Sequence, residues 1–243
     1  AGEKEIFDLI YGNYEYRFRP KQNDTDITIV TLTPTSFRLL GVNAPEQSIQ
    51  FFLDFSQSWY DYRLKWERST PSRNRSSIKI PESILWMPDI AAFSSLSRRS
   101  IIASNKRVSE VAYTGVVTKT DPLLVTNPCS MKVSRYPFDT QICKIEVGPW
   151  MYKSTELKLT LDQRIFYADD SRSTNEWEVE NITMEIKDST TEGDDSMILT
   201  IVIRRNPNQY VYVVLVPTFV NCMLCIFGLF MPTDTTGVRF EKV

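Results

Sequence analysis

A strongly apolar run without a single charge constrains the fold of this 243-residue chain more than any other feature. The run covers residues 210–231 and reads YVYVVLVPTFVNCMLCIFGLFM. At helical rise this length crosses about 30 Å, the thickness of the hydrocarbon core of a bilayer. A buried core helix is the alternative, but the strand-rich sequence upstream leaves no interior in which to place one. We therefore predict a membrane-spanning helix, preceded by a domain that folds where disulfides persist.

The sequence before this run is typical of many short β-strands separated by turn-rich clusters. Alternation with a period of two occurs in residues 28–33, 50–56, 157–162 and 181–187, and residues 197–203 are apolar except for one threonine. We predict a mainly β fold, an immunoglobulin-like β-sandwich. A short amphipathic helix should precede it, with four apolar residues on one side: Ile6, Phe7, Leu9 and Ile10.

Composition excludes several classes of function. The net charge is only −2, with acids and bases interspersed, so the chain has no nucleic-acid footprint. It contains no histidine, which removes the commonest general base and metal ligand. Neither a nucleophile elbow, nor a glycine-rich phosphate loop, nor a metal-ligand spacing is found. We predict a protein that is not an enzyme and that uses no cofactor, no metal and no nucleic-acid partner.

The four cysteines divide into two pairs with different surroundings. Cys129 and Cys143 lie in polar, β-like sequence with thirteen residues between them. A bridge between them would close a short loop and constrain the unfolded chain by about 3 kcal/mol. Cys222 and Cys225 lie in the apolar run, where we expect free thiols.

The segment between Cys129 and Cys143 has an apolar tip, Tyr136-Pro137-Phe138, followed at once by Asp139. An apolar tip on a surface loop indicates contact with a neighbouring domain or with lipid. A purely structural disulfide in some other β domain is the alternative. The cysteine spacing with Tyr-Pro-Phe-Asp-x-Gln-x-Cys, however, closely resembles the signature loop of the Cys-loop family of pentameric ligand-gated ion channels.

Other stretches resemble the same family in the same order, and together they cover nearly the whole chain. They are Arg19-Pro20 after the first helix, Trp59-x-Asp61-x-Arg63-Leu64-x-Trp66, Trp86-x-Pro88-Asp89, and Arg205-x-Pro207 before the apolar run. The resemblance is to the nicotinic-receptor-like branch. It implies an extracellular ligand-binding domain over residues 1–208, a first transmembrane helix over 209–232, and the approach to the pore helix over 233–243.

In this family a small molecule binds between two subunits among aromatic side chains. Aromatic walls suit a cationic amine, because each ring face attracts a cation by about 0.5–2 kcal/mol. The resemblance places Phe93 and Trp150 on the principal face, together with Asp194 and Asp195 of a hairpin. A core or edge aromatic in a β-sandwich is the alternative for each ring.

The complementary face departs from the family pattern, as does the hairpin. The resemblance assigns Asp54 and Thr118 to the complementary face, and Asp54 stands where the family often has tryptophan. The hairpin, residues 188–196, has no aromatic and no adjacent cysteine pair, and offers Glu192, Asp194 and Asp195 instead. These carboxylates suit a cationic ligand or Ca²⁺, and a solvated hairpin tip is the alternative.

The resemblance also implies how ligand binding is coupled to the pore. It places Glu46 and Asp139 near Arg205, at the end of the last strand, and it rests the tip Tyr136-Pro137-Phe138 on the transmembrane helices. A charged cluster at such a junction can have two arrangements, because breaking one partner leaves a costly unpaired charge.

The remaining implications concern assembly, selectivity and location. Glu241 matches the glutamate that opens the pore helix in cation-selective members, and a ring of five would concentrate cations. We expect four further subunits, a plasma-membrane location with most of this chain extracellular, and glycosylation at Asn23, Asn74 and Asn181. A soluble ligand-binding protein of the same fold, and an unrelated single-pass receptor, are the alternatives.

Overall fold

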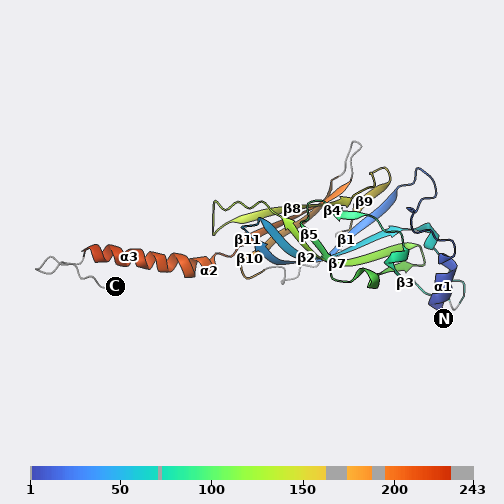
Figure 1. Cartoon of the computed structure of the whole chain (residues 1–243), viewed down its shortest axis with the longest axis horizontal. Helices are drawn as coiled ribbons and strands as arrows, with labels where there is room; N and C mark the ends of the chain where they lie inside the picture. The colour runs from blue at the N-terminus through green and yellow to red at the C-terminus, as the bar shows by residue number, and fades with distance from the viewer. Residues whose placement is uncertain (1, 71–72, 163–173, 188–194, 231–243) are drawn as a thin grey trace, which may run out of the picture.

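The period-two alternation of the sequence produces two β-sheets that pack face to face. The computed structural model describes residues 2–70, 73–162, 174–187 and 195–230, and these residues contain eleven strands. The domain is elongated, with the first helix at one end and the apolar helix extending from the other (Figure 1). The predicted β-sandwich with an N-terminal helix and a C-terminal apolar helix is confirmed.

The larger sheet has the strand order β3-β6-β7-β2-β1-β9, and β5 also pairs with β7. Its long central strands run antiparallel, whereas β9 joins β1 in parallel. The strands are β1 (Thr28–Asn43), β2 (Ser48–Tyr60), β3 (Ser77–Pro81), β5 (Ser97–Ser100), β6 (Val108–Ala112), β7 (Val116–Pro128) and β9 (Leu157–Leu161).

The smaller sheet has the order β10-β11-β8-β4, and all its pairs are antiparallel. Its strands are β4 (Ile90–Ala92), β8 (Thr140–Pro149), β10 (Trp177–Lys187) and β11 (Ser196–Arg205). Short 3₁₀ turns connect strands at η1 (Tyr62–Leu64), η3 (Glu82–Ile84) and η4 (Ser104–Lys106).

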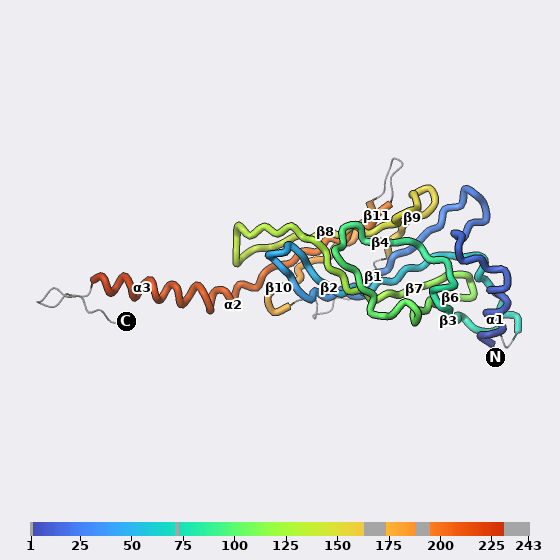
Figure 2. Tube along the Cα trace, viewed as in Figure 1, coloured from blue at the N-terminus to red at the C-terminus, as the bar shows by residue number. Residues whose placement is uncertain are grey.

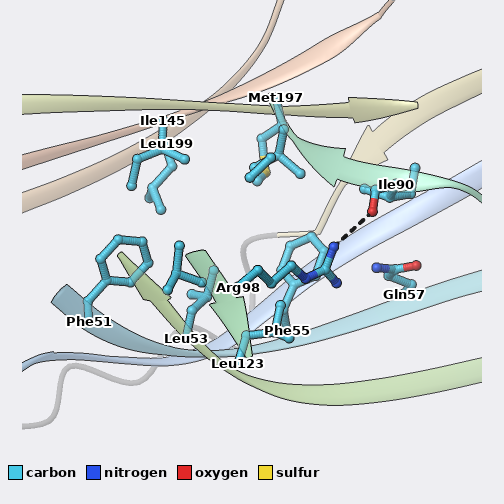
Figure 3. Close-up of a pocket in the computed structure, with 13 residues that line it drawn as sticks. Phe51, Leu53, Phe55, Gln57, Ile90, Arg98, Leu123, Ile145, Met197 and Leu199 are labelled. Carbon is cyan, nitrogen blue, oxygen red and sulfur yellow. Dashed lines mark hydrogen bonds between the residues drawn. The ribbon is translucent and has the colours of Figure 1, made fainter. Parts of the chain in front are cut away.

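The core lies between the two sheets. Phe51, Leu53 and Phe55 alternate along β2 with half-buried residues and face the smaller sheet. Ile145 of β8 and Leu199 of β11 meet them from the other side, around a small interior cavity of about 30 Å³ (Figure 3). Burial of these apolar side chains is the main favourable contribution to folding, at about 25 cal/mol per Å² of apolar surface.

A disulfide between Cys129 and Cys143 ties the two sheets together. Cys129 follows the end of β7 in the larger sheet, and Cys143 lies within β8 in the smaller one. Both cysteines are buried, whereas Cys222 and Cys225 are exposed free thiols. The prediction made for each pair is confirmed.

The first helix, α1 (Gly2–Tyr11), docks along a narrow stripe. Ile6 and Ile10 are buried, and the ring of Phe7 stacks on that of Tyr11 at 5.0 Å. Leu9 is half exposed, so its predicted place on the buried side was wrong. Ile6 and Ile10 are four residues apart and therefore share one face, while Leu9 is about 100° of helical rotation away from Ile10.

The apolar run forms a helix from Asn208 to Phe230, built of α2 (Asn208–Tyr210), a π-helical segment η6 (Val211–Leu215) and α3 (Val216–Phe230). It projects away from both sheets (Figure 2), and its residues from Tyr212 to Phe230 are exposed. Within the described part of the chain, it is the one helix long and apolar enough to cross a membrane. An exposed helix that is apolar on all sides is typical of a membrane span.

We predict that Phe51→Ala destabilises the domain by about 3–5 kcal/mol, because it removes a buried ring and leaves a cavity between the sheets. Phe18→Ala is the matched control, since the Phe18 ring is two-thirds exposed. Denaturant unfolding of the detergent-solubilised full-length protein, followed by tryptophan fluorescence, measures both variants. Equal free energies of unfolding for the two variants would contradict the assignment of Phe51 to the core.

Candidate functional site

Two exposed aromatic rings meet where β4 pairs with β8. Trp150 follows the last residue of β8 and Phe93 follows the last residue of β4, so the antiparallel register places their backbones at opposite ends of the β4–β8 pairing, and their side chains extend toward each other. Their ring centroids are 5.9 Å apart. Trp150 is 64% exposed and Phe93 37% exposed, which leaves their faces accessible. Ring faces in this position can bind a cation.

The backbone around the two rings is held by short hydrogen bonds. The amide of Phe93 donates to the carbonyl of Glu146 at 3.0 Å, and the amide of Trp150 donates to the carbonyl of Asp89 at 3.2 Å. The side chain of Asp89 accepts from the amide of Met151 at 2.6 Å. The strand ends that carry the rings are therefore fixed relative to each other.

Gly148 allows the Phe93 ring to lie against β8. A Cβ atom at position 148 would be 3.0 Å from Cζ of Phe93 and 3.1 Å from the carbonyl oxygen of Asp195. Both distances are shorter than ordinary van der Waals contact. Glycine therefore permits the aromatic ring and the start of β11 to approach the same point of the strand.

Asp195 brings a buried carboxylate to this region. Asp195 is 3% exposed, and its Oδ2 atom has no hydrogen-bond partner among the described residues. Nearby, the Ser196 hydroxyl donates to Glu146 at 2.6 Å. Glu192 and Asp194, the other predicted hairpin carboxylates, lie outside the described residues. Within the part that is described, no group of three acidic, cysteine or histidine side chains is placed to hold a metal ion.

The predicted complementary residues lie on the other sheet. Asp54 of β2 and Thr118 of β7 are both half-buried and point away from the core, because each alternates along its strand with buried residues. Thr118 pairs with Ser58, four residues along β2 from Asp54, so the two are about 13 Å apart along the strands. One subunit does not bring them together with Phe93 and Trp150, because the two pairs belong to different sheets.

The second group of residues surrounds Arg205, the last residue of β11. Arg205 is 4% exposed, and its Nε donates to Oδ1 of Asp139 at 2.8 Å. Its Nη1 donates to Oε1 of Glu176 at 2.8 Å. The guanidinium also lies over the Trp177 ring at 4.1 Å and over the Tyr136 ring at 5.0 Å. The predicted proximity of Asp139 and Arg205 is confirmed.

Asp139 is the most constrained carboxylate of this cluster. Its Oδ2 accepts from Nε2 of Gln141 at 2.6 Å, and its backbone carbonyl accepts from the amide of Arg205 at 3.1 Å. Burial by itself raises the pKa of Asp139, but the hydrogen bonds from Arg205 and Gln141 outweigh it and lower the pKa below its usual range. Burial lowers the pKa of Arg205, and the Asp139 carboxylate more than restores it.

Tyr210 connects the same cluster to the apolar helix. Its hydroxyl donates to Oε1 of Glu176 at 2.5 Å, and its ring packs edge-on against Tyr136 at 5.0 Å. Of the predicted tip, Tyr136 is half exposed, Pro137 is buried and Phe138 is 61% exposed. The Cys129–Cys143 loop, the last strand and the helix are therefore joined by one set of contacts.

Glu46 is not among the hydrogen-bonded partners of Arg205, and its predicted proximity to Arg205 stays a prediction. Glu46 is exposed, and no hydrogen bond or ion pair links it to Arg205 in the described structure. Its turn borders an open hollow of about 580 Å³ through Asn43, Ala44 and Pro45, and Arg205 lines the same hollow. Glu176 occupies the place expected for Glu46, because the chain before β10 returns to the end of β11.

The remaining predicted residues are Glu241 and the three sequon asparagines. Glu241 falls outside the described residues, and so does the rest of the approach to the pore helix. The three sequon asparagines are all exposed: Asn23, Asn74 and Asn181. Sequence patterns did not find Glu176 or Tyr210, since an isolated glutamate and one of several tyrosines carry no motif of their own.

The geometry describes a β-sandwich with a disulfide-tied loop packed against the start of an apolar helix long enough to cross a membrane. Residues 3–207 match the family model of the neurotransmitter-gated ion-channel ligand binding domain. The chain belongs to this family of Cys-loop ligand-gated ion channels, and its relatives indicate the nicotinic-receptor-like branch.

Similar curated proteins are ion-channel subunits. The chain is 29% identical over 206 residues to the proton-gated ion channel subunit pbo-6 of Caenorhabditis elegans, covering 84% of this chain and 48% of the relative. It is 25% identical over 236 residues to the neuronal acetylcholine receptor subunit alpha-2 of Rattus norvegicus, covering 96% of this chain and 46% of the relative. It is 26% identical over 235 residues to the neuronal acetylcholine receptor subunit alpha-9 of Gallus gallus, covering 95% of this chain and 48% of the relative. The chain thus spans about half the length of these relatives.

We predict that Asp139→Asn lowers the free energy of unfolding at pH 7 by about 3 kcal/mol, because it leaves a buried Arg205 with one carboxylate instead of two. The folded-state pKa of Asp139 lies below its unfolded value of about 3.9. Its contribution is therefore complete above that value and is lost as the pH falls through the lowered folded pKa. The variant should unfold with a weaker dependence on pH over this acidic range.

Denaturant unfolding between pH 3 and pH 7 measures this difference. Glu178→Gln is the matched control, because Glu178 pairs with Arg204 at 2.9 Å on an exposed surface where both side chains are more than half accessible. This control should change stability little. A parallel loss of stability at every pH in Asp139→Asn, with the acid dependence retained, would contradict the prediction.

Proposed function

We propose that this chain is a subunit of a pentameric ligand-gated ion channel that opens when a small extracellular ligand binds between subunits. The observation that carries the proposal is the buried Arg205, which holds the disulfide loop through Asp139 and the membrane helix through Glu176 and Tyr210. We call this set of contacts (Arg205 with Asp139, Glu176 and Tyr210) the joint, and a soluble domain has no need of it. A channel needs one to transmit motion from its ligand-binding domain to its pore.

The proposed ligand site uses the aromatic pair as its principal face. Phe93 and Trp150 offer exposed ring faces, and the buried carboxylate of Asp195 adds negative charge nearby. Both features favour a cationic ligand such as a small amine. Asp54 and Thr118 on the other sheet would be contributed by the adjacent subunit. Separation of the two pairs within one chain supports a site built from two copies.

The proposal divides the chain as the motifs suggest, with an extracellular domain over residues 1–208, a first transmembrane helix over 209–232 and the approach to the pore helix over 233–243. The bulk of the chain would lie outside the plasma membrane. Cation selectivity is proposed from Glu241, whose position resembles the glutamate ring of cation-selective members.

Protons are the second candidate stimulus, since one relative is named as a proton-gated subunit. This chain has no histidine, so a response to mild acid would depend on carboxylates. A soluble ligand-binding protein of the same fold is the alternative to a channel. The exposed apolar helix from Asn208 to Phe230 favours the channel.

Expression of the full-length protein in oocytes under voltage clamp tests the proposal with small amines, amino acids, protons and divalent cations. We expect an inward current that reverses near the potential for mixed Na⁺ and K⁺. Trp150→Ala should raise the half-activating concentration of an amine at least tenfold, because it removes about 1.4 kcal/mol of binding free energy from the attraction between the cation and the ring.

Met151→Ala is the matched control for this measurement. Met151 is adjacent in sequence and 77% exposed, and the substitution keeps the backbone amide that bonds Asp89. The control should leave activation unchanged. A silent channel at the cell surface, or an equal shift in both variants, would argue against the proposed site.

A double-mutant cycle on gating tests the proposed joint. Asp139→Asn and Arg205→Gln should show a coupling energy above about 1 kcal/mol, because the two side chains are in direct contact. Glu46→Gln and Arg205→Gln should be additive within about 0.5 kcal/mol. Strong coupling of Glu46 with Arg205, and none of Asp139, would exclude the joint as described.

A further inference from the structure

A compact cluster of charged side chains faces the interior of the larger sheet, away from both sites described above. Lys119 and Asp121 of β7 point inward, two residues apart on one strand. Opposite them across the sheet lie Arg107, just before β6, and Glu82 at the start of η3. The amide of Glu82 donates to the carbonyl of Arg107 at 3.1 Å, which continues the register of β3 with β6. Neighbouring strands thus bring four charges together.

The opposite charges in this cluster are too far apart for direct hydrogen bonds. Arg107 Nη1 is 3.6 Å from Asp121 Oδ2, and Arg107 Nε is 3.8 Å from Glu82 Oε2. Lys119 Nζ is likewise 3.8 Å from Glu82 Oε2. Charged hydrogen bonds are normally about 2.7–2.9 Å long. The four groups therefore make no direct hydrogen bonds to one another, and the side-chain donors of Arg107 and Lys119 remain available to a water or ion in the gap beside them.

Unpartnered polar atoms are concentrated at the same place. Of the nine buried side-chain polar atoms without a hydrogen bond in the described residues, four belong here: Gln57 Oε1, Glu82 Oε1, Arg107 Nε and Ser109 Oγ. Gln57 lies directly opposite Lys119 on β2, and Ser109 is on β6 at the equivalent level. Because buried polar atoms are nearly always hydrogen-bonded, a cluster of exceptions requires an explanation.

The charges of the cluster do not cancel. Arg98 of β5 lies at its rim, with Nη2 3.8 Å from Asp121 Oδ2. Three cationic side chains therefore face two carboxylates, a net charge of +1. Asp121 has a further bond, from the Ser100 hydroxyl to Oδ1 at 2.6 Å, whereas Arg107 and Lys119 have no side-chain hydrogen bond among the described residues. Donors and positive charge are both in excess.

Burial makes this excess costly. The side chains of Lys119 and Asp121 are 12% and 3% exposed, and that of Arg98 is about one-third exposed. Burial lowers the pKa of Lys119, and that of Arg98, which shows that the surroundings disfavour their charged forms. An uncompensated charge in such surroundings is destabilising, and a counterion would relieve it.

The interior cavity between the sheets reaches this cluster. Gln57 and Arg98 are its polar lining residues, and Figure 3 shows the guanidinium of Arg98 between the carbonyl of Ile90 and the side chain of Gln57. The cavity volume of about 30 Å³ holds about two water-sized particles. The cavity therefore adjoins the rim of the cluster at Arg98, whereas Arg107, Lys119 and Glu82 do not line it.

We propose that the gap between Arg107, Lys119 and Glu82, with Arg98 at its rim, binds one small monovalent anion of the halide class. The anion would accept from Arg107 Nε and the Lys119 ammonium, and it would cancel the net charge. Bridging water would satisfy Gln57 and Glu82. The site lies on the inner side of β2 and β7, whose outer sides carry Asp54 and Thr118, and it is independent of the proposed ligand site.

Thermal unfolding of the purified full-length protein in detergent tests the proposal. Sodium chloride or bromide is compared with sodium gluconate at one sodium concentration, so that ionic strength is constant. A halide bound to the folded state should raise the midpoint by about 2–4 °C in a saturable manner. Crystals grown with bromide should show an anomalous peak in the gap between Arg107 and Lys119.

Variants separate a bound anion from a general salt effect. Lys119→Met should abolish the halide-dependent rise, because it removes the buried ammonium and keeps the side-chain length. Arg98→Gln, at the accessible rim, should at least halve the halide-dependent rise in the unfolding midpoint. This variant keeps the test decisive if Lys119→Met fails to fold. Arg99→Gln removes one positive charge from the exposed neighbour on β5 and should keep the full rise.

Three results would overturn the proposal. They are equal midpoints in halide and gluconate, the same halide rise in Arg98→Gln as in Arg99→Gln, and a bromide-soaked structure with water but no anomalous peak in the gap. The last of these would show that the cluster is completed by water alone.

Discussion

The structure depends on one buried guanidinium. Arg205 lies at the end of the last strand with 4% exposure, and an isolated charge at that depth would be strongly destabilising. It is tolerated because Asp139 and Glu176 accept from it and because the faces of Trp177 and Tyr136 cover it. The disulfide-tied loop, the chain before β10 and the end of β11 are therefore held in one arrangement. Tyr210 extends that arrangement into the apolar helix.

In the proposed channel, the same constraint would give the domain a mechanical role. One end of the sandwich presents an accessible aromatic pair, Phe93 and Trp150, on strand ends fixed by backbone hydrogen bonds. The other end presents Arg205 and its partners next to the helix. Strands β8 and β11 run between the two ends and pair along eight residues, from Met197 opposite Val147 to Arg204 opposite Thr140. A displacement at the rings can therefore reach Arg205 through a rigid pair of strands.

Two of the buried charge clusters in the described part of this sandwich are satisfied differently. Arg205 has close hydrogen bonds of 2.8 Å to two carboxylates. Arg107 and Lys119 have carboxylates only at 3.6–3.8 Å, and the atoms around them lack partners. The first cluster is complete within one chain. The second is not, and this difference is the physical basis for assigning an anion to it.

The sequence alone determined the fold class, because alternating apolar residues on strands such as β2 leave a sandwich as the way to bury one face of each sheet. It determined the pairing of Cys129 with Cys143, since the other two cysteines lie in the apolar run, and the family resemblance of its motifs implied that Phe93 and Trp150 share one face. Only the tertiary structure decided which carboxylates surround Arg205. Glu176 is 29 residues away along the chain and has no motif, while Glu46 matched the family pattern and makes no hydrogen bond or ion pair with Arg205 in the described structure. The buried cluster of Lys119 and Arg107 was equally invisible, because strand register and sheet order, rather than local spacing, bring these charges together. Local periodicity records which face of a strand is buried, but the partners of a buried charge depend on how distant strands are joined.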